Sequence, residues 1–391
     1  MTGTLRGKAF IAGAFEHPRR EIPDRTVAEI HAEVALGALA DAGLSMTDVD
    51  AFYCAGDAPG FGGLSLADYL GLRCRTMDST ETGGSSYLLH VGHAVAAIAA
   101  GHAQVALITL GGRPRSGGAA AGSDVNVGGA PEAEFENLWG ASVVGYYALG
   151  ARRHMYEYAT TSRQLAEIKV AASLHAQHNP NAFNRNLVTV DEVVDSPMIA
   201  DPLHRLDCCV ITDGGGALVV VSPEIARSLA RRSVKILGEG EAVKHTAGGR
   251  VALTHTGAVW SGPEAFAEAG VTPADIDYVS IYDSFTITVL MTIEDLGFCD
   301  KGDGGRFVSD GALVAPHGRL PFNTDGGGLC NNHPANRGGM TKIVEAVRQL
   351  RGEAHPAVQV PDCRLALAHG TGGTISTRHV SATLILGTED A

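Results

Sequence analysis

Short apolar runs alternate with amphipathic segments along the chain. The runs Lys8–Gly13, Val49–Cys54 and Gln104–Leu110 predict strands, and Thr26–Ala42 between them has apolar residues at helical spacing. A second helix, Ser85–Ala100, is apolar on nearly every face, which is typical of a helix buried between other layers. This alternation predicts a parallel sheet with helices on both faces.

The same order of elements recurs in the second part of the chain. A second helix after a glycine pair is predicted at Gly338–Leu350. The further predicted elements are strands at Gly215–Ser222, Val234–Leu237, Ile276–Tyr282, Leu365–His369 and Ala382–Gly387 and a helix at Gly262–Ala269. The recurrence predicts two duplicated five-stranded α/β halves, residues 1–230 and 231–391, whose buried helices pack together. Residues 112–207 then form a loop-rich and helix-rich insertion in the first half.

Composition narrows the class of protein. The net charge of −13, with only 30 Lys and Arg, argues against binding to nucleic acid or to an anionic membrane surface. The seven cysteines show no metal-binding spacing, and no apolar run reaches transmembrane length. Because the chain also begins with a predicted strand instead of a secretory segment, we expect a cytoplasmic protein with reduced thiols and no metal.

The glycine pair Gly83–Gly84 lies where the first buried helix begins. Glycines at this point let another group approach the free N–H groups and the positive end of the helix dipole. An anion, a thiolate or a polarised carbonyl would be stabilised there.

Several long motifs resemble the thiolase superfamily, in particular the sterol-carrier-protein-type thiolases. They cover nearly the whole chain in the family's order. The motifs are Ser196–Leu203 before Asp213-Gly214-Gly215, Tyr282–Thr286, Leu296–Cys299, Asn323–Gly328, His333-Pro334, Val347–Gly352 and Ala368–Gly373. The resemblance implies the thiolase fold, two βαβαβαββ halves in five layers (α-β-α-β-α).

The departures from the family pattern concern its catalytic residues. The family's spacing puts its nucleophilic cysteine at Gly84, so we expect a vacancy there that could admit a bulkier substrate carbon. The family's His-Asp pair is Tyr282-Asp283 in this chain, and its Gly-His-Pro loop is Asn332-His333-Pro334 followed by residues 335–337. Without an activated nucleophile no acyl-enzyme can form, so ordinary thiolase activity is not expected.

Aldol chemistry on a CoA thioester needs no acyl-enzyme. The pattern is similar to the thiolase-like aldolases of bacterial steroid side-chain degradation, which work with a DUF35-class partner containing an OB fold. That resemblance implies a retro-aldol lyase that cleaves a β-hydroxyacyl-CoA on a steroid or alicyclic skeleton to a ketone and a short acyl-CoA such as propionyl-CoA. Tyr282 would take the hydroxyl proton, while His333 and His369 would hold the enolate oxygen. It also implies a homodimer and no cofactor other than the CoA of the substrate.

Each of these residues has a structural alternative. Tyr282 could be a core tyrosine, Asp283 a helix N-cap and His369 a polar core residue. The supporting residues are Asp283, Asn332 and Gly84, and Gly372 and Gly373 are candidates for substrate binding. Cys330 is the one cysteine near the motif loops, displaced from the family positions, and Arg113 and Arg115 could contact phosphates. A silent acyl-CoA-binding protein and a cysteine-independent C-acyltransferase remain alternative functions.

Overall fold

The computed structural model describes residues 5–55, 58–119, 134, 138, 142–245, 250–334 and 338–391. In this part of the chain nine strands form one mixed sheet in the order β3-β2-β4-β7-β1-β8-β11-β10-β9. The first half supplies β1 (Phe10–Glu16), β2 (Ala51–Cys54), β3 (Thr76–Asp78), β4 (Val105–Gly112) and β7 (Gly214–Val221). The second half supplies β8 (Val234–Lys244), β9 (Tyr278–Ile281), β10 (Leu365–Gly373) and β11 (His379–Gly387).

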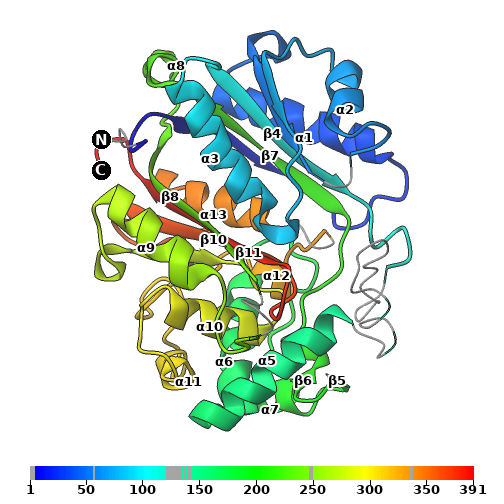
Figure 1. The fold of residues 1–391 in the computed structure, drawn as a ribbon, viewed down its shortest axis with the longest axis vertical. Helices are drawn as coiled ribbons and strands as arrows, with labels where there is room; N and C mark the ends of the chain where they lie inside the picture. The colour runs from blue at the N-terminus through cyan, green and yellow to red at the C-terminus, as the bar shows by residue number, and fades with distance from the viewer. Residues whose placement is uncertain are drawn as a thin grey trace.

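The helices form three layers around the two parts of this sheet (Figure 1). Helices α3 (Ser86–Ala99) and α13 (Gly339–Arg351) lie between the two parts, in one core with the inner faces of the strands. Helix α1 (Val27–Ala42) covers the outer face of the first part, and α9 (Ala258–Ala269) and α10 (Thr286–Asp295) cover that of the second. The five-layer thiolase arrangement expected from the resemblance is therefore confirmed.

The two parts of the sheet are joined by backbone pairing. Strand β1 pairs with β7 on one side and, through Phe10 and Ile11, with β8 on the other. The second part has four strands among the described residues, not the five expected by duplication. Where the fifth would lie, Phe322 makes only an isolated bridge with Val279.

The two central helices touch at their N-termini. A 3₁₀ turn, Gly83–Ser85, leads into α3, and Gly338 precedes α13. A Cβ atom on Gly339 would lie only 1.9 Å from the carbonyl oxygen of Gly84, so the two backbones are in direct contact. The predicted packing of two buried helices is confirmed, and it depends on a glycine where the backbones meet.

The insertion forms a helical layer next to α10 and α12 (Gly327–Cys330), at the lower end of the view in Figure 1. Its elements are α5 (Val143–Tyr158), α6 (Ser162–Ala176), α7 (Val190–Val194), β5 (Met198–Ala200) and β6 (Leu203–His204). The remaining short helices are α2 (Gly63–Tyr69), α8 (Pro223–Ser228) and α11 (Gly304–Phe307). None of the helices in the described part of the chain is both long enough and apolar enough to span a bilayer.

Candidate active site

Tyr282 lies directly after β9, at the mouth of the central helix α3. Its backbone N–H donates to the carbonyl oxygen of His369 (2.9 Å), which extends the pairing of β9 with β10 by one residue. Its ring packs against Gly84. A Cβ atom on Gly84 would lie 2.4 Å from two carbons of that ring and 2.4 Å from the carbonyl oxygen of Thr371.

This contact corrects the expectation of a vacancy at Gly84. Any side chain at position 84 would overlap the Tyr282 ring, so the tyrosine occupies the space that the missing side chain leaves. Gly84 is needed because no other residue fits beneath the ring. The site therefore contains a buried phenol where the family has its thiolate.

His333 is a polar partner of the Tyr282 hydroxyl. Its Nε2 lies 2.8 Å from Tyr282 Oη, and the two rings are 5.3 Å apart at 57°. The pKa of His333 is lowered to about 4, mainly by burial; the negative charge of Asp283 opposes this shift and the positive charge of Lys342 contributes to it. The imidazole is therefore neutral at pH 7. With its proton on Nδ1, it can accept a hydrogen bond from the phenol at Nε2.

Asp283 caps a helix, but not the one expected from its position. Phe285, and not Asp283, is the N-cap of α10. The Asp283 carboxylate instead accepts the N–H groups of Gly328 (2.8 Å) and Leu329 (3.1 Å) in α12, the turn that leads to His333. It also forms an ion pair with Lys342 of α13 at 2.7 Å. Asp283, which follows Tyr282, thus fixes the position of α12, which precedes His333.

Lys342 stays charged although it is buried. Burial alone would lower the pKa of its ammonium group, but the negative charges of Asp283 and Asp325 outweigh burial and raise it. Lys169 of α6, also buried, donates to the carbonyl oxygen of Leu329 at 2.6 Å. The four-residue helix α12 therefore has a carboxylate at its N-terminus and an ammonium group at its C-terminal end.

Asn332 is buried next to His333 and connects it to the first half of the chain. Its Oδ1 accepts a hydrogen bond from Thr212 Oγ1 (2.7 Å), and its Nδ2 donates to Glu16 Oε1 (2.9 Å). Thr212 Oγ1 in turn accepts the backbone N–H of His333 at 2.9 Å. The supporting role of Asn332 stays a prediction, and residues 335–337 lie outside the described part of the chain.

His369 does not join this pair. It pairs with Ile281 in the sheet, so its side chain lies on the outer face of β10, whereas that of Tyr282 lies on the inner face. Its Nδ1 contacts Thr383 Oγ1 at 2.9 Å, and Thr383 contacts Ser261 of α9 at 2.9 Å. The expected convergence of Tyr282, His333 and His369 is therefore wrong for His369.

Gly372 and Gly373 belong to β10 itself, although the strand was expected to end at His369. A Cβ atom on Gly372 would lie 1.5 Å from the carbonyl oxygen of Thr82, so this glycine allows the turn before α3 to approach the strand. Gly373 has a positive φ of 75°. Both glycines thus have a backbone role, and substrate binding by either stays a prediction.

The other candidates from the sequence lie in ordinary protein contacts. Cys330 is buried beside Lys169 (3.2 Å), and burial raises the pKa of its thiol, which does not favour a nucleophile. Arg113 donates to the Pro23 carbonyl, and Arg115 lies 4.4 Å from the Phe183 ring. Among the described residues no group of three His, Cys, Asp or Glu side chains could hold a metal ion.

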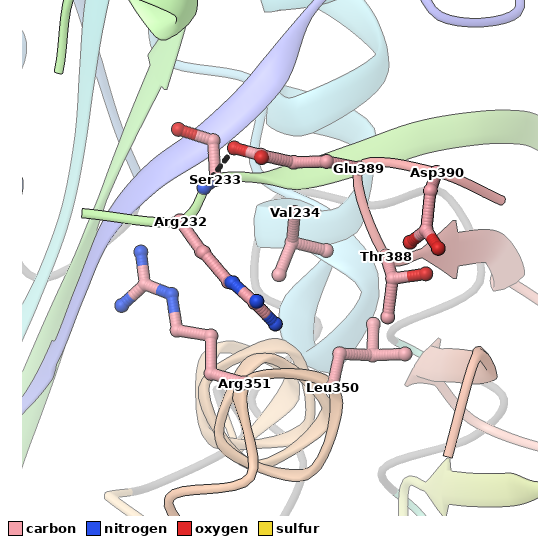
Figure 2. A pocket seen from close by; sticks show the side chains of 8 residues that line it. All are labelled: Arg232, Ser233, Val234, Leu350, Arg351, Thr388, Glu389 and Asp390. Carbon is pink, nitrogen blue, oxygen red and sulfur yellow. Dashed lines mark hydrogen bonds between the residues drawn. The ribbon is translucent and has the colours of Figure 1, made fainter. Parts of the chain in front are cut away.

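A cavity of about 250 Å³ lies at the other end of α13, and Figure 2 shows the side chains that line it. It is lined by Arg232–Val234, Leu350, Arg351 and Thr388–Asp390. It lies a full helix length, roughly 20 Å, from Gly338 and the Tyr282–His333 pair. None of the predicted site residues lines it, so it is separate from the candidate active site.

Comparisons with known proteins agree with the thiolase fold. Residues 240–388 match the family described as "Thiolase C-terminal domain-like". The chain is 34% identical to an acetyl-CoA acetyltransferase of Methanothermobacter thermautotrophicus, covering 92% of this chain and 95% of the relative. It is also 34% identical to the 17-hydroxy-3-oxo-4-pregnene-20-carboxyl-CoA lyase of Mycobacterium tuberculosis, covering 89% and 92%.

Among solved structures, the chain resembles one described as "Ltp2-ChsH2(DUF35) aldolase". The TM-score is 0.88 at 31% identity, covering 98% of this chain and 99% of that one. The chain therefore belongs to the thiolase superfamily. Within the superfamily it stands with the Ltp2-like aldolases, which are carbon–carbon lyases. Identity alone does not separate lyases from acetyltransferases, but Gly84 beneath Tyr282 leaves no cysteine at the acylation position.

Proposed function

We propose that this protein cleaves the Cα–Cβ bond of a β-hydroxyacyl-CoA whose β-carbon belongs to a bulky alicyclic or steroid skeleton. The observation that carries the proposal is the Tyr282–His333 hydrogen bond at 2.8 Å, at the position where thiolysis would require a cysteine. The lyase relative is named for a steroid CoA thioester with a 17-hydroxyl group, which supports a substrate of this class. The products would be a ketone and a short acyl-CoA such as propionyl-CoA.

The pair can move the proton that a retro-aldol cleavage releases. As the Cα–Cβ bond breaks, its electrons pass to the thioester as an enolate, and the β-oxygen forms a ketone and loses its proton. Tyr282 Oη accepts that proton while it gives its own to Nε2 of the neutral His333. Proton return to the enolate carbon completes the acyl-CoA and restores the pair.

Charge on the enolate oxygen is favoured by the two helix N-termini beside Tyr282. Gly84 and Gly338 both lie in contact range of the Tyr282 ring, and each begins a run that leads into a buried helix. The positive ends of the dipoles of these two helices attract negative charge. This assigns His333 to proton transfer instead of enolate binding, and it leaves His369 outside the chemistry.

The test is turnover of 17-hydroxy-3-oxo-4-pregnene-20-carboxyl-CoA, followed by mass spectrometry of the ketone and propionyl-CoA. We expect Tyr282→Phe to lower kcat by about 10²- to 10⁴-fold, the range for a general acid–base group, while the ring still covers Gly84. Tyr156→Phe is the matched control because Tyr156 is 83% exposed on α5. No cleavage by the wild-type protein, alone or with a partner, would contradict the proposal.

The same proposal includes two protein partners. The aldolase structure that matches this chain with a TM-score of 0.88 is named together with a DUF35 protein, which supports a partner of that OB-fold class. Strand β3 forms one edge of the sheet and carries the partly exposed Met77, which supports a homodimer through this edge. Light scattering of the protein with and without a DUF35 protein would test both, since a monomer that gains no mass contradicts them.

A further inference from the structure

A backbone segment from the first half, residues 209–212, lies between the two segments that carry Tyr282 and His333. The N–H of Cys209 donates to the Ser284 carbonyl oxygen and that of Val210 to the Gly328 carbonyl oxygen, both at 2.9 Å. At the end of the segment, Thr212 forms two hydrogen bonds with the backbone of His333, one as donor and one as acceptor. Its N–H donates to the His333 carbonyl oxygen (3.4 Å), and its Oγ1 accepts the His333 N–H (2.9 Å).

The direction of the hydrogen bonds at Thr212 is fixed by Glu16. Burial alone would raise the pKa of Glu16, but the charges of Arg20 and Arg348 outweigh it and lower the pKa, so the carboxylate is ionised and can only accept. Asn332 must therefore turn its NH₂ group to Glu16 Oε1, which leaves its Oδ1 facing Thr212 at 2.7 Å.

The Thr212 hydroxyl must then donate to Asn332, and its lone pair is left for the His333 N–H. All of these groups are buried, and Thr212 and Asn332 are fully inaccessible to solvent. No other partner for the His333 N–H is recorded among the described residues. The Thr212 hydroxyl thus connects the His333 backbone, through Asn332, to the ionised carboxylate of Glu16 in β1.

We propose that Thr212 is a positioning residue that holds His333 Nε2 within hydrogen-bonding distance of Tyr282 Oη. It acts through the His333 backbone and touches neither substrate nor the reacting atoms. The inference rests on the proposed aldolase function. Proton transfer across a 2.8 Å contact is sensitive to displacements of a fraction of an ångström, so loss of the hydroxyl should affect the rate of the chemical step more than substrate binding.

The test compares Thr212→Val, which keeps the shape and removes the hydroxyl, with Thr212→Ser, which keeps the hydroxyl. We expect the Val variant to lose about 10- to 100-fold in kcat with KM little changed, and the Ser variant to recover most of that loss. In the Val variant the acid limb of the rate profile should also move up from about pH 4, because a displaced His333 is less buried. Thr212→Ala gives the same readouts if the Val variant does not fold.

Thr383→Val is the matched control. Thr383 is a buried threonine that also bonds to a histidine, His369, on the outer face of the sheet. It should lose thermal stability without a selective fall in kcat. Wild-type kinetics in Thr212→Val, or equal effects of both Val variants on kcat, would overturn the inference. A wild-type protein that cleaves no β-hydroxyacyl-CoA would instead overturn the proposed function, so the two failures are distinguishable.

Discussion

Two buried histidines on opposite faces of one sheet show how position decides the use of a side chain. His333 and His369 are both buried, and burial lowers the pKa of His333 to about 4 and that of His369 to about 3. His333 lies on the inner side against the Tyr282 hydroxyl, whereas His369 lies on the outer side against Thr383. Both imidazoles are thus neutral at pH 7, but only that of His333 forms a hydrogen bond with a phenol.

The difference shows that burial and a lowered pKa do not identify a catalytic histidine. Among the described residues the Nε2 of His369 is buried without a hydrogen-bond partner, so no proton donor or acceptor of this part of the chain faces it. His333 has two residues that connect it to the rest of the site, Tyr282 through its ring and Thr212 through its backbone.

The largest expected difference between the two histidines is in turnover. His333→Gln removes the proton acceptor of Tyr282, so kcat should fall by about 10²- to 10⁴-fold. In the wild-type protein, activity should not fall as pH drops through 6.5, because His333 takes up a proton only near pH 4. Steady-state rates from pH 5 to 8 check both statements. A titration near 6.5 that disappears in His333→Gln would show instead that His333 is solvated.

A middle-sized effect is expected at Gly84, on the inner face. Gly84→Ala places a methyl group against the Tyr282 ring and should cost about 1–3 kcal/mol of unfolding free energy as well as activity. In Gly84→Ala/Tyr282→Ala the ring is absent and only the close approach to the Thr371 carbonyl oxygen remains, so the loss of stability should be smaller than the sum of the two single losses. Urea unfolding of the two single variants and the double variant measures this coupling, and strict additivity would show that the residues do not touch.

The smallest effect on activity is expected at His369. His369→Gln should keep kcat within about threefold, because the side chain faces away from Tyr282. The substitution should instead change the stability of the protein at acidic pH. The unfolded chain binds a proton at this histidine near pH 6.5 and the folded chain only near pH 3, so stability falls as pH decreases below 6.5.

In His369→Gln, the free energy of unfolding should therefore fall by about 1.4 kcal/mol less for each pH unit below 6.5 than in the wild-type protein. Unfolding free energies measured at pH 7 and pH 5 test it. A large loss of turnover in His369→Gln, with His333→Gln unaffected, would reverse the comparison.

Much of the fold follows from local patterns in the sequence. Both buried helices and most predicted strands appear within four residues of their predicted ends, because apolar periodicity and glycine positions are local signals. The exception is β8, which was expected to end at Leu237 but continues to Lys244. Strand β3 was not predicted, since three residues give too little alternation. Ends were misplaced where glycines continue a strand, as in β10, because their role depends on what packs against them.

The site was predictable in part. The Tyr282–His333 pair follows from the motifs, and strand alternation puts His369 on the same face as Leu367, but only the structure shows that this is the outer face. Lys342, Lys169 and Thr212 carry no such signal. A lysine on an amphipathic helix normally faces solvent, and only the packing of distant segments around Asp283 and α12 shows that these residues are buried.

The contact between Gly84 and Tyr282 restricts the order in which such a site can arise from a thiolase. With a side chain at position 84, a tyrosine at position 282 has no room, because the ring and the added carbon would be 2.4 Å apart. With glycine already at 84, the tyrosine can enter. On this geometry, a path from a thiolase loses the side chain at 84 before it gains the tyrosine, and the chain between these two steps would have neither the old chemistry nor the new.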